Sequence, residues 1–208
     1  MPQSYRHQKK IDSLNIYPAF TDLMSNAFMI LSLFLLLALF QATDLNRKLQ
    51  SASPIVIDEK SGNFKFPSGS AELTLPLKLY ITKQVIPAIE QVVKEKQGAI
   101  EFVQVIGHTD GQENNMASNL DQRLETVAAG QATVKVLTPG SNTDLGLMRA
   151  LAVIQEIRKT GRFRKIEFKA YSAGQLYDAS GNLASINRKP DESRRRIEIR
   201  FIPPGKKQ

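Results

Sequence analysis

The stretch Ile100–Asp110, IEFVQVIGHTD, has the pattern of a core strand that ends in a polar loop. Apolar residues alternate in part with polar ones up to Ile106, which is typical of a strand that packs one face against a core. The loop that follows carries an acid, Asp110, at the carboxyl end of the strand. We therefore predict a sheet that contains this strand and a polar group at the strand's end.

The segments before this strand predict a strand pair and a helix. Pro54–Ile57 and Phe64–Phe66 flank the turn residues Gly62-Asn63, a spacing that indicates two short strands. Apolar residues in Leu75–Lys96 recur mostly at helical spacing. Pro87 lies inside that segment and is expected to kink or break the helix.

The segments after the strand predict a second helix and two more strands. Asp144–Lys159 has a helical pattern, whereas Ile166–Ala170 and Arg196–Phe201 have strand patterns, the latter with strict alternation. Four residues of the second helix are expected to face inward: Leu147, Leu151, Ile154 and Ile157. The order of elements predicts an α+β sandwich, with two helices on one face of a mixed sheet.

A long apolar run, Ser13–Thr43, precedes this domain and contains a single charged residue, Asp22. Residues 17–41 are long enough to cross a bilayer as one helix. Large residues follow the apolar core where a signal-peptide cleavage site needs small ones, so we expect the span to be retained. Basic residues before the span favour a cytoplasmic N-terminus, and the larger C-terminal part is expected to be exported.

These assignments divide the chain into five parts. Residues 1–16 form an N-terminal tail on the cytoplasmic side, 17–41 form the transmembrane helix, and 42–54 form a polar linker. A compact domain covers 55–202 and is followed by a basic tail, 203–208. A linker of this length reaches about 45 Å at full extension.

Asp22 is the most informative residue of the span, because an ionisable group at the centre of a membrane helix costs roughly 2.5–3.5 kcal/mol. On a helix it shares one face with Ser25 and Asn26, and Met29 and Ser32 continue that face. One interpretation is that Asp22 caps the helix N-terminus at the membrane surface. The other is a carboxylate that accepts an ion and faces partner subunits, since one span cannot form an ion path alone.

The composition narrows the chemistry of the chain. Without cysteine it has no disulfide, thiolate metal site or cysteine nucleophile. Its two histidines are His7 in the tail and His108 in the domain, so a multi-histidine metal site is not expected. No acid pair or nucleophile constellation indicates an enzyme, and no cofactor is predicted. The net charge of +8 and the pI of about 9.7 suit polyanionic neighbours such as wall polymers, anionic lipids or nucleic acid.

Four motifs occur in the order that is found in one protein family. They are Phe66–Leu73, Gly107–Asp110, Asn142–Ala150 and the strand residues Arg196–Ile199. Together they resemble the OmpA-like peptidoglycan-binding domain, and the resemblance covers residues 55–202. The fold that this family implies agrees with the α+β sandwich predicted from the spacing.

The resemblance implies a binding site for the diaminopimelate residue of the wall's stem peptide. In that family an aspartate holds the ammonium of this residue and a helix arginine holds a carboxylate, which here correspond to Asp110 and Arg149. Asn142 and Leu145 match the rest of the helix motif. A fixed acid and a forked guanidinium suit a zwitterionic amino acid through charge-assisted hydrogen bonds. His108 is expected to be structural and not catalytic.

Three features depart from the family pattern. Gly111–Ser141 is longer than the matching segment of the compact family form, and we expect a loop with one helical turn there. Gly146 stands where the family has serine, and Arg194 stands where it has asparagine. The insertion bears most on the shape of the predicted wall-binding pocket.

The segment Pro18–Ala27 resembles the aspartate-containing helix of MotB-type stator subunits, in which one membrane helix precedes an OmpA-like wall anchor. This resemblance implies that Asp22 carries protons or sodium ions. It also implies that two such chains pair inside a ring of multi-span MotA-like subunits in the bacterial inner membrane. The linker 42–54 is too short for the long linker and plug helix of flagellar MotB proteins. It is more similar to that of ZorB, the MotB-like subunit of the Zorya anti-phage system, whose partner is ZorA.

Three alternatives stand beside a motor subunit in anti-phage defence. A flagellar stator subunit would use the same residues, whereas a passive wall tether would have no use for Asp22. A nucleic-acid binder is suggested by Arg194–Arg196 and Lys206-Lys207. Arg194–Arg200 is better interpreted as an alternating strand with one solvated face, so no nucleic-acid partner is predicted.

Overall fold

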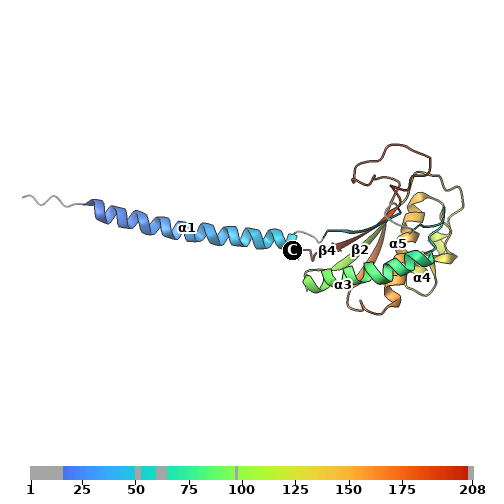
Figure 1. Ribbon diagram of the computed structural model, residues 1–208, viewed down its shortest axis with the longest axis horizontal. Coiled ribbons are helices and arrows are strands. Elements are labelled where there is room, and N and C mark those ends of the chain that lie inside the picture. Colours follow the sequence, from blue (N-terminus) through green and yellow to red (C-terminus); the bar gives the residue numbers. More distant parts are fainter. Residues whose placement is uncertain (1–15, 50–52, 60–64, 97, 206–208) are drawn as a thin grey trace, which may run out of the picture. The chain divides into compact units, whose positions relative to one another are not determined.

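The structure is a computed structural model, and the residues that it describes are 16–49, 53–59, 65–96 and 98–205. The chain divides into two compact units, Met1–Leu49 and Gln50–Gln208. Within the described residues the first unit is one helix, and the second contains every strand (Figure 1). The interpretations placed on residues 1–15, on Gly62-Asn63 and on 206–208 lie outside the described residues.

The first unit is the helix α1, Ile16–Leu49, which has 34 residues. Its stretch Phe20–Asp44 is long and apolar enough to cross a membrane. The helix continues past the predicted end of the span at residue 41, because residues 42–49 are mostly good helix formers such as Ala, Leu, Lys and Arg. The structure thus shortens the predicted linker, since its first part belongs to α1.

The second unit is built on a four-stranded sheet with the strand order β1-β4-β2-β3. The strands are β1 Ile55–Asp58, β2 Phe102–His108, β3 Glu167–Gly174 and β4 Arg196–Ile202. β2 pairs parallel with β3 and antiparallel with β4, and β4 pairs antiparallel with β1, so the sheet is mixed. The predicted fold class, one apolar helix followed by an α+β domain with a mixed sheet, is confirmed.

The predicted pairing of the first strand with Phe64–Phe66 is wrong. β1 pairs with β4 instead, and Ile55 lies opposite Ile199. Residue 64 lies outside the described part of the chain, and neither Lys65 nor Phe66 belongs to a strand. Phe66 is held instead by side-chain packing, because its ring is buried and lies 4.8 Å from the guanidinium carbon of Arg149.

The helix predicted over Leu75–Lys96 is present but is not uniform. It consists of α2 Leu75–Tyr80, a π-helical turn Ile81–Val85 and α3 Ile86–Glu95. We expected Pro87 to kink or break this helix, but the helix continues through it. Proline has no backbone N–H to donate, and Pro87 lies in the first turn of α3, where that donor is not needed. In the wider π turn the Ile86 N–H bonds to the Ile81 carbonyl, which makes room for the proline ring.

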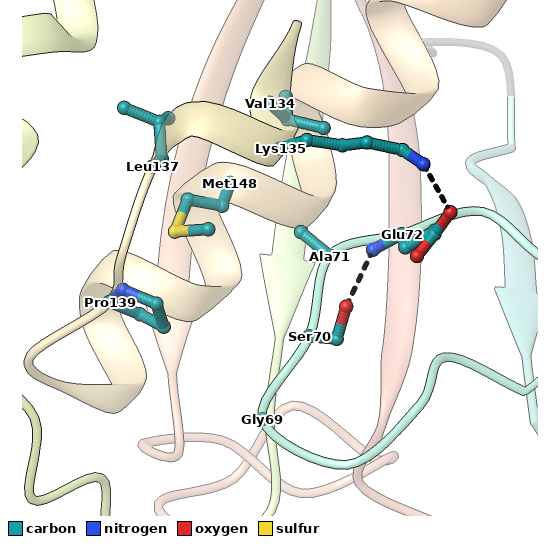
Figure 2. A pocket seen from close by; sticks show the side chains of 9 residues that line it. All are labelled: Gly69, Ser70, Ala71, Glu72, Val134, Lys135, Leu137, Pro139 and Met148. Carbon is teal, nitrogen blue, oxygen red and sulfur yellow. Dashed lines mark hydrogen bonds and ion pairs between the residues drawn. The ribbon is translucent and has the colours of Figure 1, made fainter.

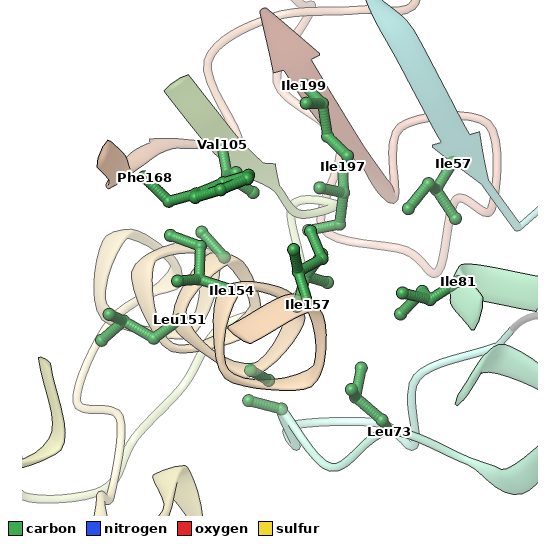
Figure 3. Close-up of a cluster of buried hydrophobic side chains, with 14 of the residues drawn as sticks. Ile57, Leu73, Ile81, Val105, Leu151, Ile154, Ile157, Phe168, Ile197 and Ile199 are labelled. Carbon is green, nitrogen blue, oxygen red and sulfur yellow. The ribbon is translucent and has the colours of Figure 1, made fainter. Parts of the chain in front are cut away.

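The helix α5, Asn142–Lys159, packs on β2 and β3 and completes the core. Leu151, Ile154 and Ile157 are buried in the core cluster, as predicted (Figure 3). Leu147 is half-buried against the same cluster. Alternate residues of each strand face this cluster, among them Val103, Val105, Ile197, Ile199 and Phe201. Residues of α2 and α3 belong to the cluster as well, so both predicted helical segments cover one face of the sheet.

The insertion Gly111–Ser141 contains more secondary structure than predicted. It forms the helix α4, Leu120–Ala128, and a 3-10 turn, Val134–Val136, in place of a loop with one helical turn. Leu120 and Val127 are buried. Gln155 of α5 donates hydrogen bonds to the carbonyls of Val127 and Ala132. These contacts hold the insertion against α5 and account for its additional structure.

β4 does not have the predicted solvated face. Arg196 and Glu198 are buried, and Arg200 is exposed. Glu198 accepts hydrogen bonds from Arg196 Nε at 2.9 Å and from Arg200 Nη2 at 2.6 Å. The connection between β3 and β4 covers this face, because Arg196 also donates to the carbonyl of Tyr177. The run of charges is therefore a paired, largely buried network.

Candidate functional site

The carboxyl end of β2 and the first turns of α5 meet at what we call the polar corner. Gly107 and Gly146 allow this approach, because a Cβ on Gly107 would lie 1.9 Å from the Gly146 carbonyl oxygen. Ser141 starts the helix there, since its Oγ accepts a hydrogen bond from the Asp144 N–H at 3.1 Å. The end of the strand and the start of the helix thus share one surface.

The four residues predicted to bind peptidoglycan all lie at the polar corner. Asn142, Leu145 and Arg149 follow one another at three- and four-residue spacing along one face of α5, and Asp110 follows β2. They line an open hollow of about 140 Å³. The hollow is also lined by Ser68, Gly69, Gln112, Glu113, Asn114 and Arg195. Segments far apart in the sequence therefore converge on the predicted residues.

Asp110 is buried, and both of its carboxylate oxygens are engaged. Oδ1 accepts from the Gln112 N–H at 3.3 Å, which is long for a hydrogen bond. Oδ2 accepts from the Asp191 N–H at 3.2 Å and from Arg195 Nη1 at 2.9 Å. One cation thus already balances the predicted acceptor, and Oδ1 is its more available oxygen.

Arg195 is a member of the site that sequence analysis missed. It joins Asp110 to a second buried acid, Glu59, because its Nε donates to Glu59 Oε2 at 2.6 Å. Burial lowers the pKa of Arg195, but hydrogen bonds and attraction from Glu59 and Asp110 outweigh burial and raise it. No local sequence pattern indicated Arg195; the strand register does, because Arg196 pairs with His108 and so places Arg195 beside the end of β2.

Arg149 is the most deeply buried charge of the polar corner, with 2% of its surface exposed. Its guanidinium lies 4.8 Å from the centre of the Phe66 ring, and its Nε donates to the Ser70 carbonyl at 3.1 Å. Burial lowers the pKa of Arg149 to about 10, although Glu59 and Asp110 favour its charged form. The group is a cation at neutral pH, and among the described residues only its Nε has a hydrogen-bond partner.

Asn142 connects the helix to the start of the insertion. Its Nδ2 donates to the Gln112 carbonyl at 2.7 Å, and its Oδ1 accepts from Asn114 Nδ2 at 3.0 Å. Leu145 is buried and gives the hollow an apolar wall. Asn142 is therefore a positioning residue, whereas Leu145 is placed to contact a ligand.

A second hollow, of about 230 Å³, adjoins the first through Gly69 (Figure 2). Residues 69–72 form one wall, and the end of the insertion forms another. Lys135 of the insertion pairs with Glu72 across this hollow at 2.6 Å, and Met148 of α5 also lines it. The start of the insertion thus lines the hollow around Asp110, and its end extends the surface beside the polar corner.

His108 is buried and does not line the hollow around Asp110. Its Nε2 lies 3.1 Å from Glu198 Oε1, close but not aligned as a hydrogen bond. The pKa of Glu198 is lowered to about 2, and His108 is the largest cause of this shift. Burial of Glu198 opposes the shift, whereas Arg200 and Arg196 add to it. This contact agrees with the structural role expected for His108.

The residues predicted for ion transport lie on α1. Asp22, Ser25 and Asn26 fall on one helical face, and all three are exposed in the single chain. The described helix begins at Ile16 and has no acid in its first turn. The interpretation of Asp22 as a cap of the helix N-terminus is therefore wrong.

No protein-family model and no curated protein matches this chain. Several solved structures are similar to it. The periplasmic domain of Helicobacter pylori MotB is 17% identical over 75% of this chain and 79% of that chain, with a TM-score of 0.45. A putative MotB-like protein from Desulfovibrio vulgaris is 14% identical over 73% of this chain and 75% of that chain, with a TM-score of 0.44.

The cell wall anchor of the T6SS from Pseudomonas aeruginosa is 19% identical over 80% of this chain and 96% of that chain, with a TM-score of 0.39. The structural neighbours are thus MotB-like periplasmic domains and a wall anchor, at low sequence identity. Because these identities are below 20% and the TM-scores are below 0.5, no residue role is taken from them.

Proposed function

We propose that this chain anchors an ion-driven membrane motor to the bacterial cell wall. In this proposal α1 lies in the inner membrane with its N-terminus in the cytoplasm, and the second unit lies in the periplasm. The observation that carries the anchoring role is the open hollow where the buried Arg149 and the Asp110 carboxylate both line the wall, and where the Nη donors of Arg149 have no hydrogen-bond partner among the described residues. A pre-oriented guanidinium beside an acid suits an amino acid that carries both charges.

The proposed ligand is the diaminopimelate residue of the wall's stem peptide. Its carboxylate binds the Nη donors of Arg149, and its ammonium binds Oδ1 of Asp110, since Oδ2 is occupied by Arg195. Leu145 supports the ligand's methylene chain, and Asn142 holds the loop that borders the hollow. The role follows from this arrangement and involves no enzymatic step.

Sedimentation with isolated peptidoglycan tests the anchoring role. We expect Arg149→Lys to weaken binding roughly tenfold, because lysine keeps the charge but lacks the fork that holds a carboxylate. Asp110→Asn is expected to weaken binding as well. Arg123→Lys, at an exposed position of α4, is the matched control. Undiminished wall binding by an Arg149→Lys variant that unfolds at the wild-type temperature would contradict the proposal.

We propose Asp22 as the ion carrier, with Ser25 and Asn26 as its neighbours in the path. A carboxylate inside an apolar span is costly and is typical of ion and proton pathways. Within one chain, the described side chains of α1 are exposed or half-buried, so its polar face needs partners. The proposed partners are a second copy of this chain and multi-span subunits of the MotA or ZorA type.

The substitution Asp22→Asn tests this role in cells that also make the partner subunits. It removes the ionisable group at almost constant size, so we expect ion flux and activity to be abolished while membrane insertion and assembly persist. Asp44→Asn, at the other end of the apolar stretch, is the matched control and should retain flux. Normal activity of the Asp22→Asn variant would leave a passive wall tether as the function.

Among ion-driven motors, we propose the Zorya-type defence complex in preference to a flagellar stator. The residues between the end of α1 at Leu49 and the start of β1 at Ile55 are too few for a long linker with a plug helix. Protection of a host against phage, lost on Asp22→Asn, is the expected result. Restored swimming of a strain that lacks its own stator would assign the chain to the flagellar motor instead.

A further inference from the structure

A hollow of about 520 Å³ lies between the end of α3 and the loop that leads from α5 to β3. Its apolar lining consists of Val93, Phe163 and Ile166, which are half-buried. Four exposed cations also line it, namely Lys94, Arg162, Arg164 and Lys165. We call this surface, defined by these seven residues, the basic hollow.

Most of the positive charge of the basic hollow has no ion-pair partner among the described residues. Arg162 pairs with Glu90, with 3.3 Å between Nη1 and Oε1. The other three cations of the basic hollow, Lys94, Arg164 and Lys165, form no ion pair with a described residue. The nearby acid Glu167, at the start of β3, pairs with Lys169 instead. Four cations against the single lining acid leave a surplus of three positive charges.

The topology places the basic hollow at the end of the sheet where the chain enters the second unit. Phe102, Glu167 and Ile202 lie together at this end, and the loop of the basic hollow leads directly into Glu167. β1 runs antiparallel to β4 and starts at Ile55, so the residues before it extend toward the same end. The polar corner follows His108, at the opposite end of β2.

We propose that the basic hollow docks the second unit onto anionic phospholipid headgroups of the membrane that α1 crosses. The proposal rests on the membrane placement of α1 in the proposed function, but not on ion transport or wall binding. Exposed lysine and arginine side chains are attracted to anionic lipid surfaces, and half-buried aromatic and aliphatic groups suit the interface. The chain between Leu49 and Ile55 spans about 20 Å at most, so the second unit cannot leave the vicinity of the surface.

Docking at this end leaves the polar corner facing away from the bilayer, where a wall peptide can reach it. The surface is therefore suited to hold the second unit upright while the opposite end is free to bind. This is an interaction that the wall-binding residues do not provide, since the basic hollow and the polar corner share no residue.

The absence of cysteine allows docking to be measured with single labels on the full chain. Gln91→Cys places a label on α3 beside the basic hollow, and Ser68→Cys places one at the polar corner. Each labelled chain is reconstituted into neutral bilayers and into bilayers with about 30% anionic phospholipid. Quenching by a nitroxide attached to the lipid headgroup is then recorded. We expect stronger quenching of the label at position 91 in the anionic bilayer, and no such change at position 68.

A charge variant tests whether the cations cause this difference. Lys94→Gln, Arg164→Gln and Lys165→Gln are combined in one chain, and each lost charge is expected to weaken docking about fivefold. A matched control replaces three exposed cations elsewhere with glutamine, at Arg123, Lys135 and Lys189. The charge variant should lose the extra quenching and the control should keep it. Salt near 1 M should also remove it, because it screens exposed charges.

Equal quenching of position 91 in the two bilayers, or equal quenching in the charge variant and the unaltered chain, would overturn the proposal. Loss of peptidoglycan binding by the charge variant, with lipid-dependent quenching unchanged, would assign the basic hollow to a wall polymer and also overturn it. Arg149→Lys is expected to leave the quenching unchanged. Failure of docking and failure of wall anchoring are therefore distinguishable.

Discussion

At the residue scale, the polar corner depends on charges that are paired before any ligand arrives. Arg195 lies between Asp110 and Glu59, with 2.9 Å and 2.6 Å to their carboxylate oxygens. Arg149 has a single hydrogen bond to the described protein, so it is the cation with donors to spare. Removing one member of such a buried network leaves another charge uncompensated. In the proposed function a ligand would therefore meet preformed charges, of which Arg149 and the weakly bonded Oδ1 of Asp110 are the more available.

Glu198 makes the stability of the second unit depend on pH. Its pKa is lowered from 4.5 to about 2 by His108 first, with further contributions from Arg200 and Arg196. A carboxyl whose folded pKa is lowered adds stability above its unfolded pKa and loses it as the pH falls toward the folded value. We expect a contribution of about 1–3 kcal/mol, below the full value of the shift because the His108 contact is not aligned as a hydrogen bond. It is complete above about pH 5 and is lost between about pH 4.5 and 2.

Urea unfolding of the unaltered chain and of the Glu198→Gln variant measures this contribution. Unfolding is monitored by the near-ultraviolet circular dichroism of the tyrosine side chains. The difference in unfolding free energy between them should shrink as the pH is lowered from 7 to 2.5. Glu90→Gln is the matched control, because its pair with Arg162 is exposed and exposed pairs contribute little. A difference for Glu198→Gln that stays constant over this range would show that another group carries the effect.

At the element scale, the contact between α5 and β2 decides where the site residues lie. Gly107 and Gly146 bring the two backbones together, so Asn142 and Arg149 on the helix come beside the end of the strand. Gly146, which departs from the family pattern, fits this contact because a Cβ there would lie 2.3 Å from Ser172 Oγ. The site is thus assembled by a close helix–strand approach in which a Cβ at either glycine would meet atoms of the other element.

Substitution of the two glycines should have graded effects. A Cβ at Gly107 meets a backbone oxygen at 1.9 Å, so α5 must move, and we expect Gly107→Ala to cost about 3 kcal/mol or more. A Cβ at Gly146 meets Ser172 Oγ, which can rotate, and the Gly107 carbonyl oxygen at 2.7 Å, which cannot. Because this backbone contact is less severe than the one at Gly107, Gly146→Ala should cost less, about 1–3 kcal/mol. Thermal unfolding measures both. Gly205→Ala, which adds a Cβ in open space, is the control, and equal stability of all three variants would refute the ranking.

At the scale of the whole molecule, two charged surfaces lie at opposite ends of one sheet. The polar corner follows the carboxyl end of β2, and the basic hollow adjoins the amino end of β3. Sites that are well separated and share no residues respond additively to substitution. If both proposals hold, wall binding and membrane docking should therefore be independent of each other.

Combining Arg149→Lys with the three-charge variant of the basic hollow tests this independence. We expect peptidoglycan binding to fall as in Arg149→Lys alone, and lipid-dependent quenching to fall as in the charge variant alone. The coupling free energy between Arg149→Lys and the three charge substitutions should stay within about 0.5 kcal/mol. A larger coupling in either measurement would show that the two ends of the sheet compete for one conformation.

The sequence by itself determined most of the elements and the candidate site residues. α1, β2, β3, β4 and α5 were predictable because apolar periodicity is a local property of the chain. Asp110, Asn142, Leu145 and Arg149 were selected by motifs whose order along the chain is visible without a structure. The single charge at Asp22 in an apolar run was visible in the same way.

Only the tertiary structure decided which of these residues meet and which charges are buried. Arg195 and Glu59 join the polar corner through contacts between positions far apart in the chain, so no local pattern indicates them. Arg196 and Glu198 alternate as a solvated face would, yet the connection between β3 and β4 covers them. Burial and ion pairing depend on what packs over a residue, and periodicity records only which side of its own element a residue occupies.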